Sequence, residues 1–348
     1  LTLHPEVRSI YLNQELTLYN NDATALTGVD KAQTDATMTK KNGGIPVSGK
    51  GVTVVVNDSG IDGTHKDVEF GKNLIQNTLG TTNLHSLVDL LSITYVEDVV
   101  NTDSNSGHGT HVAGTVGGTG VMSNGKYEGV APGANLVGYG SGGALLILDA
   151  VGGFDYSLTH QFQYDIRVIT NSWGSSGDFD PENPVNIASK MAYDRGIVVL
   201  FAAGNSGPGE DTHNPYAKAP WVISVAAGDK QGKLADFSSR GVKDKEGTFT
   251  MDGEMWTWKD RPSITAPGVD IISTRVIAPV SSLAADADIS TIEPAYVPFY
   301  TTMSGTSMAT PHVAGIVALM LDANPALSPA EVKQVLEKTA TNIPGGES

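Results

Sequence analysis

The chain has no cysteine among its 348 residues, and this absence removes several kinds of chemistry at once. A disulfide framework, a thiolate zinc site, an iron–sulfur cluster and a cysteine nucleophile all require thiols. Any bound metal ion would therefore have to use oxygen or imidazole ligands. At this length the chain can nevertheless bury a large hydrophobic core without covalent cross-links.

Long apolar runs and basic charge are also scarce. The longest apolar stretches, at 197–203 and 313–321, fall well short of the ~20 residues that span a bilayer. No basic segment followed by an apolar one opens the chain at Leu1, so we expect that any targeting peptide was removed or lies outside this sequence. The 38 acidic and 22 basic side chains give a net charge of −16, which repels phosphate backbones and anionic lipids. Neither nucleic acid nor a membrane is an expected partner.

Short apolar runs rich in β-branched residues alternate with segments of helical pattern. The runs lie at 51–58, 134–139, 167–173, 196–203 and 221–227, and the helical segments at 108–120, 143–164 and 183–195. Strands that are apolar on both faces and alternate with helices indicate a parallel sheet covered on both sides. We therefore predict an α/β fold of three layers, with a mostly parallel central sheet flanked by helices. Four of the runs end in polar or Gly-rich sequence, at the strand ends where such sheets bind ligands.

The C-terminal part of the chain predicts two further helices. One runs from about Ser307 to Leu321, and the other begins at Ser328, where Ser-Pro-Ala-Glu forms a capping box with proline in the first turn. Two segments look inserted, at 240–262 and 276–300, and we expect both to form surface hairpins or loops. The first carries Trp256 and Trp258. We expect the acidic pairs Glu97/Asp98 and Asp286/Asp288 to be solvated.

Three motifs contain one acid, one imidazole and one hydroxyl in distinctive surroundings. Asp58 ends the first apolar run in VVVNDSGID, His108 lies in SGHGTHVAG where a helix begins, and Ser307 lies in SGTSMATPHVAG at the start of another. A serine becomes a nucleophile when an imidazole takes its proton and a carboxylate orients that imidazole. The Ser307 backbone N–H, at a helix start, and the side-chain amide of Asn205 in AAGNSG can stabilise an oxyanion.

The three motifs, in the chain order Asp, His, Ser, resemble those of the subtilisin-like serine proteases, the subtilases, which are the reference example of this order and of an oxyanion asparagine. The resemblance covers roughly residues 45–340. It implies a subtilisin-like fold and a serine endopeptidase that forms an acyl-enzyme on Ser307. In that reading Asp58 orients His108, His108 acts as general base and then general acid, and Asn205 completes the oxyanion hole.

The neighbouring polar residues have plainer interpretations. His111 and His312 fall on predicted helices and are expected to be structural. Ser304 and Thr306 are expected to form a turn, and Asp62 is expected to take no catalytic part because it follows the strand end.

Two segments are similar to those that bind substrate in the family, where an extended peptide pairs with strand edges. They are Gly140-Ser141-Gly142-Gly143 and Ser172-Trp173-Gly174. The alternative is that both are ordinary glycine-rich turns. The second segment reads SWGS where the family commonly has SLGG. Trp173 therefore predicts a pocket reshaped at P1 or P4 and a preference for aromatic or large aliphatic P1 residues.

The N-terminal segment resembles part of an inhibitory propeptide. Residues 5–19 are similar to the closing strand of that propeptide, and Leu16 to Tyr19 would offer an apolar P4 and an aromatic P1 residue. We predict that 1–20 is the remnant of the chain's own propeptide inhibitor, that 21–348 is the catalytic domain, and that autocatalytic cleavage occurs at or shortly after Tyr19. The alternative is a mature N-terminal arm packed on the body.

The resemblance implies no cofactor for the chemistry and allows a structural calcium ion. Asp67 matches a position that supplies a calcium ligand in the family, but the loop at 118–129 lacks the usual asparagine-rich pattern. The metal ligands therefore stay unassigned.

We further expect the enzyme to act on protein and peptide substrates, to be monomeric, and to be secreted to an extracellular location. The acidity predicts salt tolerance, because salt screens self-repulsion.

Three other classes of protein would differ from this sequence at specific residues. A related carboxyl peptidase would carry Glu in place of His108 and Asp in place of Asn205. A catalytically dead binding protein would not need the four intact residues. A lipase or esterase would show a G-x-S-x-G elbow, whereas the serine here stands in G-T-S-M-A.

Overall fold

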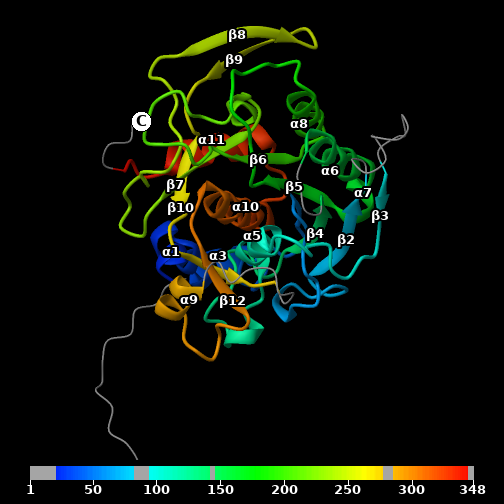
Figure 1. Cartoon of the computed structure of the whole chain (residues 1–348), viewed down its shortest axis with the longest axis vertical. Coiled ribbons are helices and arrows are strands. Elements are labelled where there is room, and N and C mark those ends of the chain that lie inside the picture. Colours follow the sequence, from blue (N-terminus) through cyan, green and yellow to red (C-terminus); the bar gives the residue numbers. More distant parts are fainter. Residues whose placement is uncertain (1–20, 82–93, 142–145, 277–284, 344–348) are drawn as a thin grey trace, which may run out of the picture.

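A central eight-stranded sheet organises the computed structural model, which describes residues 21–81, 94–141, 146–276 and 285–343 (Figure 1). The strand order is β10-β7-β6-β5-β1-β4-β2-β3, and every pair is parallel except β2 with β3. The bounds are β1 Thr53–Asp58, β2 Leu74–Gly80, β3 Tyr95–Val96, β4 Asn135–Gly140, β5 Ile166–Asn171, β6 Val198–Ala202, β7 Ile223–Gly228 and β10 Ile264–Pro267. The predicted α/β fold with a mostly parallel sheet is confirmed.

Helices cover both faces of the sheet because side chains of each strand alternate between the faces. In β1, Val54 and Val56 belong to one core cluster and Val55 to the other. The first cluster contains side chains of α5 (His108–Gly117), α10 (Thr306–Ala323) and α11 (Pro329–Thr339). The second contains side chains of α6 (Ile147–Thr159) and α8 (Pro184–Asp194). These clusters form the two interfaces of a three-layer structure.

Smaller elements complete the described chain. Short helices are α1 Asn21–Thr27, α2 Val29–Thr34, α3 Ala36–Lys41, α7 Gln161–Tyr164 and α9 Ala285–Thr291, with 3₁₀ turns η1 Lys66–Val68, η2 Val121–Ser123 and η3 Pro215–Lys218. Two antiparallel pairs lie outside the main sheet: β8 (Glu246–Met251) with β9 (Glu254–Lys259), and β11 (Ile271–Thr274) with β12 (Tyr300–Met303). Among the described helices, none is long and apolar enough to span a membrane.

The strand predictions agree with the structure, since each of the five apolar runs overlaps a strand of the main sheet. The predicted helix at 143–164 is divided into α6 and α7. The helix expected from about Ser307 begins one residue earlier, at Thr306, because Gly305 is its N-cap. The capping box at Ser328 is confirmed, with Glu331 bonded back to the cap.

The two inserted segments differ from each other. The first forms the β8–β9 hairpin, as expected (Figure 1). Its Trp256 ring lies 5.4 Å from that of Trp221. In the second, the expectation that Asp288 is solvated is wrong. Asp288 is fully buried in α9, pairs with Arg275 and accepts a hydrogen bond from the backbone of Thr302. Such partners offset the cost of burying a charge.

Candidate active site

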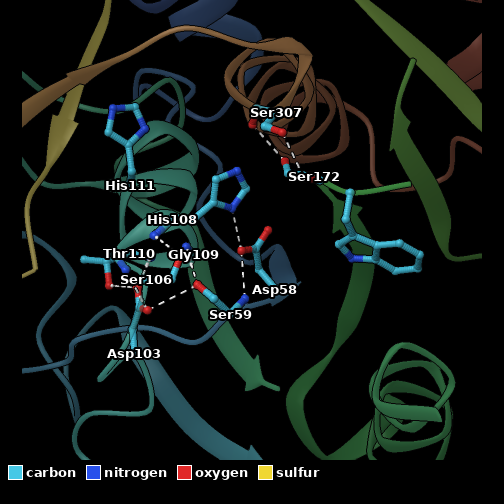
Figure 2. A network of polar contacts seen from close by, with 12 residues as sticks. Asp58, Ser59, Asp103, Ser106, His108, Gly109, Thr110, His111, Ser172 and Ser307 are labelled. Carbon is cyan, nitrogen blue, oxygen red and sulfur yellow. Dashed lines mark hydrogen bonds and ion pairs between the residues drawn. The ribbon is translucent and has the colours of Figure 1, made fainter. Parts of the chain in front are cut away.

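Asp58 and His108 meet where β1 ends and α5 begins. His108 Nδ1 lies 2.7 Å from Asp58 Oδ1, and the Ser59 backbone N–H donates to the same oxygen at 2.7 Å (Figure 2). Asp58 is buried, whereas 30% of the His108 side chain remains exposed. The carboxylate thus fixes Nδ1 as the donor and leaves Nε2 as the nitrogen that can accept a proton.

Charge around His108 favours its protonated form. Burial disfavours the imidazolium, but the charge of Asp58, its hydrogen bond to the ring and the charge of Asp103 outweigh that effect and raise the pKa of His108 above 6.5. A general base works only when deprotonated. Activity that depends on His108 should therefore rise with pH through a midpoint above 6.5.

Ser307 is the second residue of α10 and faces the segment that follows β5. Its Oγ donates to Ser172 O at 2.9 Å, and Ser172 Oγ donates to Ser307 O at 2.8 Å. No hydrogen bond joins Ser307 to His108 within the described part of the chain, and the view in Figure 2 places the imidazole between Asp58 and this serine pair. A rotation about Cα–Cβ redirects the hydroxyl, and catalytic hydrogen bonds are often loose without substrate.

Two hydrogen-bond donors lie beside Ser307. Its own backbone N–H has no partner among the described residues. Asn205 Oδ1 accepts from both the backbone N–H and the hydroxyl of Thr306, each at 2.9 Å. These bonds orient the Asn205 amide so that its Nδ2 group is free to donate. Two such donors can together stabilise an oxyanion.

The predicted substrate segments lie at the ends of β4 and β5, the two strands that flank β1 in the sheet. Gly140 ends β4, and Ser141 donates its N–H to Asp58 O at 3.0 Å; Gly142 and Gly143 lie outside the described residues. Ser172, Trp173 and Gly174 follow β5 directly.

The indole of Trp173 packs against the core cluster that α6 and α8 cover. Its Nε1 donates to Asn57 O at 2.7 Å, and the ring lies 5.2 Å from Phe201 and 6.0 Å from Tyr216. The side chain is half-buried, so part of it remains available at the surface. Its effect on specificity stays a prediction.

One residue that organises this region was not identified from the sequence. Asn214 is buried and donates through Nδ2 to Trp173 O at 3.1 Å and to Ala202 O at 2.8 Å. A Cβ built on Gly174 would lie 2.3 Å from Asn214 Nδ2, so the Gly174 backbone lies directly against the Asn214 side chain. Asn214 therefore ties the segment after β5 to the end of β6. Nothing in the local sequence THNPY signals this role.

The two additional histidines have internal partners. His111 Nε2 lies 2.9 Å from Ile271 O, and His312 Nε2 lies 2.9 Å from Thr27 Oγ1. Burial lowers the pKa of each to about 4. Both rings are therefore neutral near pH 7, which fits the structural role expected for them.

The neighbouring hydroxyl and acid side chains also have local roles. Asp62 accepts from the backbone and hydroxyl of Thr64, and Ser304 Oγ donates to Asp270 Oδ1. Thr306 positions Asn205, as described above.

The surroundings of Asp67 do not fit the calcium site that the resemblance allows. Asp67 is fully buried; its Oδ1 accepts from Met122 N at 3.0 Å and its Oδ2 from the Tyr300 hydroxyl at 2.5 Å. A calcium ion needs several free oxygen ligands, whereas these donors already use both carboxylate oxygens. Within the described ranges, no cluster of three or more His, Asp or Glu side chains could hold a metal ion.

The fold and these residues define a serine hydrolase with an Asp-His-Ser arrangement on a three-layer α/β core. Residues 49–348 match the model of the subtilase family, and the chain therefore belongs to that family of serine proteases, which act on protein substrates.

Relatives named as proteases agree with this assignment. The chain is 34% identical to the serine protease AprX of Bacillus subtilis (strain 168) over 95% of its own length and 69% of AprX. It is 35% identical to subtilisin DY of Bacillus licheniformis over 70% of this chain and 73% of that protein.

Two solved structures show the same fold. A psychrophilic protease superposes with a TM-score of 0.65 and 28% identity, covering 89% of this chain and 88% of that one. Sphericase superposes with a TM-score of 0.64 and 26% identity, covering 90% of this chain and 89% of that one.

Proposed function

We propose that the chain is a serine endopeptidase of broad specificity whose acyl-enzyme forms on Ser307. The observation that carries this proposal is the bond between His108 Nδ1 and Asp58 Oδ1, which orients the ring beside the start of α10. Asp58, His108, Ser307 and Asn205 each come from a different segment, and the fold brings them together at the carboxyl ends of β1 and β6 and at the start of two helices.

The reaction follows from the positions of these groups. His108 Nε2 takes the proton of Ser307 Oγ as the oxygen attacks the substrate carbonyl carbon. The carbonyl oxygen becomes an oxyanion between the Ser307 N–H and Asn205 Nδ2. The imidazolium then gives its proton to the leaving amine, and the peptide bond breaks. His108 then takes a proton from a water molecule as its oxygen attacks the ester carbonyl carbon, and the imidazolium returns that proton to Ser307 Oγ as the ester bond breaks.

Substrate would bind as an extended strand beside the residues that follow β4 and β5. Trp173 supports the proposed preference for aromatic or large aliphatic P1 residues, because its indole adds apolar bulk at the end of β5. Profiling a peptide library tests this: best cleavage after small or charged residues would defeat it.

The helices that follow residue 20 support a catalytic unit beginning near residue 21. Thr27 contacts His312 on α10, Gln33 donates to Val130 O, and Ser48 N donates to Asp322 Oδ2 at 2.8 Å. We place autocatalytic cleavage at or shortly after Tyr19, with the removed segment as the inhibitor; residues 1–20 themselves lie outside the described residues. Intact mass of the active enzyme is the test, since a mature chain starting at Leu1 would contradict processing here.

We further propose that the enzyme is extracellular, monomeric and salt-tolerant. The net charge of −16 supports salt tolerance, because salt screens repulsion between like charges. If activity and melting temperature both fell steeply between dilute buffer and molar NaCl, this part would be wrong. Sedimentation at several concentrations tests the monomer.

The proposed function as a whole is tested by turnover. Wild type and Ser307→Ala should be compared on casein and on a peptide library, with and without chelator. Wild type is expected to cleave both substrates and Ser307→Ala to cleave neither at a measurable rate. A folded wild type without activity would favour a catalytically dead binding protein.

A further inference from the structure

A second buried carboxylate lies behind the catalytic pair. Asp103, in the loop before α5, is 1% exposed and accepts four hydrogen bonds. The donors are Gly107 N at 2.9 Å, Thr110 N at 3.0 Å, Thr110 Oγ1 at 2.7 Å and Ser59 Oγ at 3.2 Å. Three of these belong to the start of the helix that carries His108.

Ser59 connects this carboxylate to Asp58. Its backbone N–H donates to Asp58 Oδ1 at 2.7 Å, its hydroxyl donates to Asp103, and its Oγ accepts from Gly109 N at 2.9 Å (Figure 2). The two carboxylates, the end of β1 and the first turn of α5 thus form one continuous hydrogen-bonded network. Its members surround His108 on the side away from Ser307.

The backbone in this network is packed without free space. A Cβ on Gly109 would lie 2.1 Å from Gly60 O, and a Cβ on Gly60 would lie 2.3 Å from Thr102 O. Gly60 also has φ of +135°, a conformation that other residues rarely adopt. The position of α5 relative to β1 is therefore set by this contact and by the bonds to Asp103.

The charge of Asp103 also acts on the imidazole. Among the described residues, three titratable groups act on His108: Asp58 on β1, Asp103 on the preceding loop and His111 on the same helix. His111 is neutral near pH 7, and burial of the imidazole opposes its protonation. The two negative carboxylates therefore stabilise the imidazolium that forms when the ring takes a proton.

We propose that Asp103 is a positioning residue for the reaction: it holds the first turn of α5 against β1 through Ser59 and stabilises the charged form of His108. This inference rests on the proposed endopeptidase function. The competing interpretation is that Asp103 only caps a helix, as acidic residues near helix starts often do. If Asp103 were only a cap, its removal would lower the stability of the fold but would leave the titration of His108 unchanged.

The decisive experiment compares three variants in the full chain: Asp103→Asn, Ser59→Ala and, as a matched control, Asp62→Asn. The control removes another buried carboxylate of this region, whose Oδ1 accepts from the backbone N–H and the hydroxyl of Thr64. For each variant we would measure kcat and KM against pH on a peptide substrate, together with thermal unfolding.

Asp103→Asn is expected to lower kcat by roughly 10- to 100-fold with little change in KM, since orientation of the base is lost. The acid midpoint of kcat/KM should move to lower pH by about half to one unit, because a negative charge near His108 is gone. Ser59→Ala should lower kcat several-fold. It should keep the wild-type acid midpoint of kcat/KM, because the charge of Asp103 remains. Asp62→Asn should keep the wild-type midpoint.

A folded Asp103→Asn enzyme with the wild-type midpoint and kcat would overturn the inference. If this variant did not fold, Ser59→Ala and Thr110→Val would decide, since each removes one bond to Asp103; an unchanged kcat in both would overturn it. The titration of His108 by NMR in the Ser307→Ala background, with and without Asp103→Asn, gives a readout that does not need activity. An inactive wild type would instead defeat the proposed function itself.

Discussion

The starts of α5 and α10 are built in opposite ways, although each presents a residue that we propose to be catalytic. At α5 the protein satisfies the first N–H groups itself: Asp103 accepts from Gly107 and Thr110, Ser59 accepts from Gly109, and Ser106 Oγ accepts from His108 at 3.3 Å. At α10 Asn205 accepts from Thr306, and the N–H of Ser307 has no partner among the described residues.

This difference matches what each residue must do. A general base has to keep one orientation throughout the reaction, so a fully bonded helix start serves it well. An oxyanion exists only briefly, and the donor that stabilises it must be in place beforehand and free to bind. The free N–H groups and the helix dipole at a helix start supply such a donor. The closed start thus holds the proposed base, and the open start holds the proposed nucleophile and oxyanion donor.

The largest expected effect comes from removing the nucleophile at the open start. Ser307→Ala should lower kcat by about 10⁶-fold, the magnitude found when the serine of a subtilisin triad is removed. Rates on a chromogenic peptide, with the protein purified away from wild type, measure this loss. A residual rate within 100-fold of wild type would mean that the hydrolysis has another nucleophile.

The next effect tests the oxyanion donor. Asn205→Ala should lower kcat by about 10²–10³-fold with KM nearly unchanged, which is the range for removing the corresponding donor in a subtilisin. Asn205→Asp is the matched variant, since it keeps an acceptor for Thr306 but loses the N–H donors. It should be at least as slow, because its charge repels the oxyanion. Activity within threefold of wild type in either variant would remove Asn205 from the mechanism.

A smaller effect concerns the buried histidines in the two helices, His111 in α5 and His312 in α10. Each has a pKa of about 4 when folded and about 6.5 when unfolded, so the unfolded chain binds more protons between these values. Stability should therefore fall as pH drops from 6.5 to 4, by up to about 3 kcal/mol for each ring. Urea unfolding of Ser307→Ala, which prevents self-digestion, measures the slope.

His312→Gln provides the matched control for this slope. The glutamine can keep a hydrogen bond to Thr27 but cannot titrate. The loss of stability between pH 6.5 and 4 should therefore be smaller in this variant by about the contribution of one histidine. An identical slope in both proteins would show that His312 is not held neutral by burial.

The smallest effect concerns Asp67, away from both helix starts. Tyr300→Phe removes a donor from a buried carboxylate and should lower stability by about 1–3 kcal/mol. If the Tyr300 hydroxyl takes the place of a cation, added calcium should restore part of that loss in the variant and leave wild type unchanged at this site. Calcium-dependent melting of wild type that disappears in Asp67→Asn would contradict this.

The sequence predicted the parts that depend on local pattern. Alternating strand and helix patterns were sufficient for the parallel sheet, and long motifs around Asp58, His108 and Ser307 were sufficient for the family.

Other features depend on contacts between distant segments, and no local pattern reveals them. Asp103 precedes a turn-like Ser-Asn-Ser and shows no sign that it bonds to Ser59 and Thr110. Asp288 is buried against Arg275, which immediately precedes the inserted segment.

The rate of labelling by a fluorophosphonate, followed by intact mass as a function of pH, tests the division between the two helix starts most directly. The label reacts with the nucleophile at α10, and its pH dependence reports the base at α5. We predict one adduct on wild type, located at Ser307 and absent in Ser307→Ala, with a rate that rises through a midpoint above pH 6.5. An adduct at another residue, or a rate at Ser307 that does not change across the titration of His108, would contradict the account.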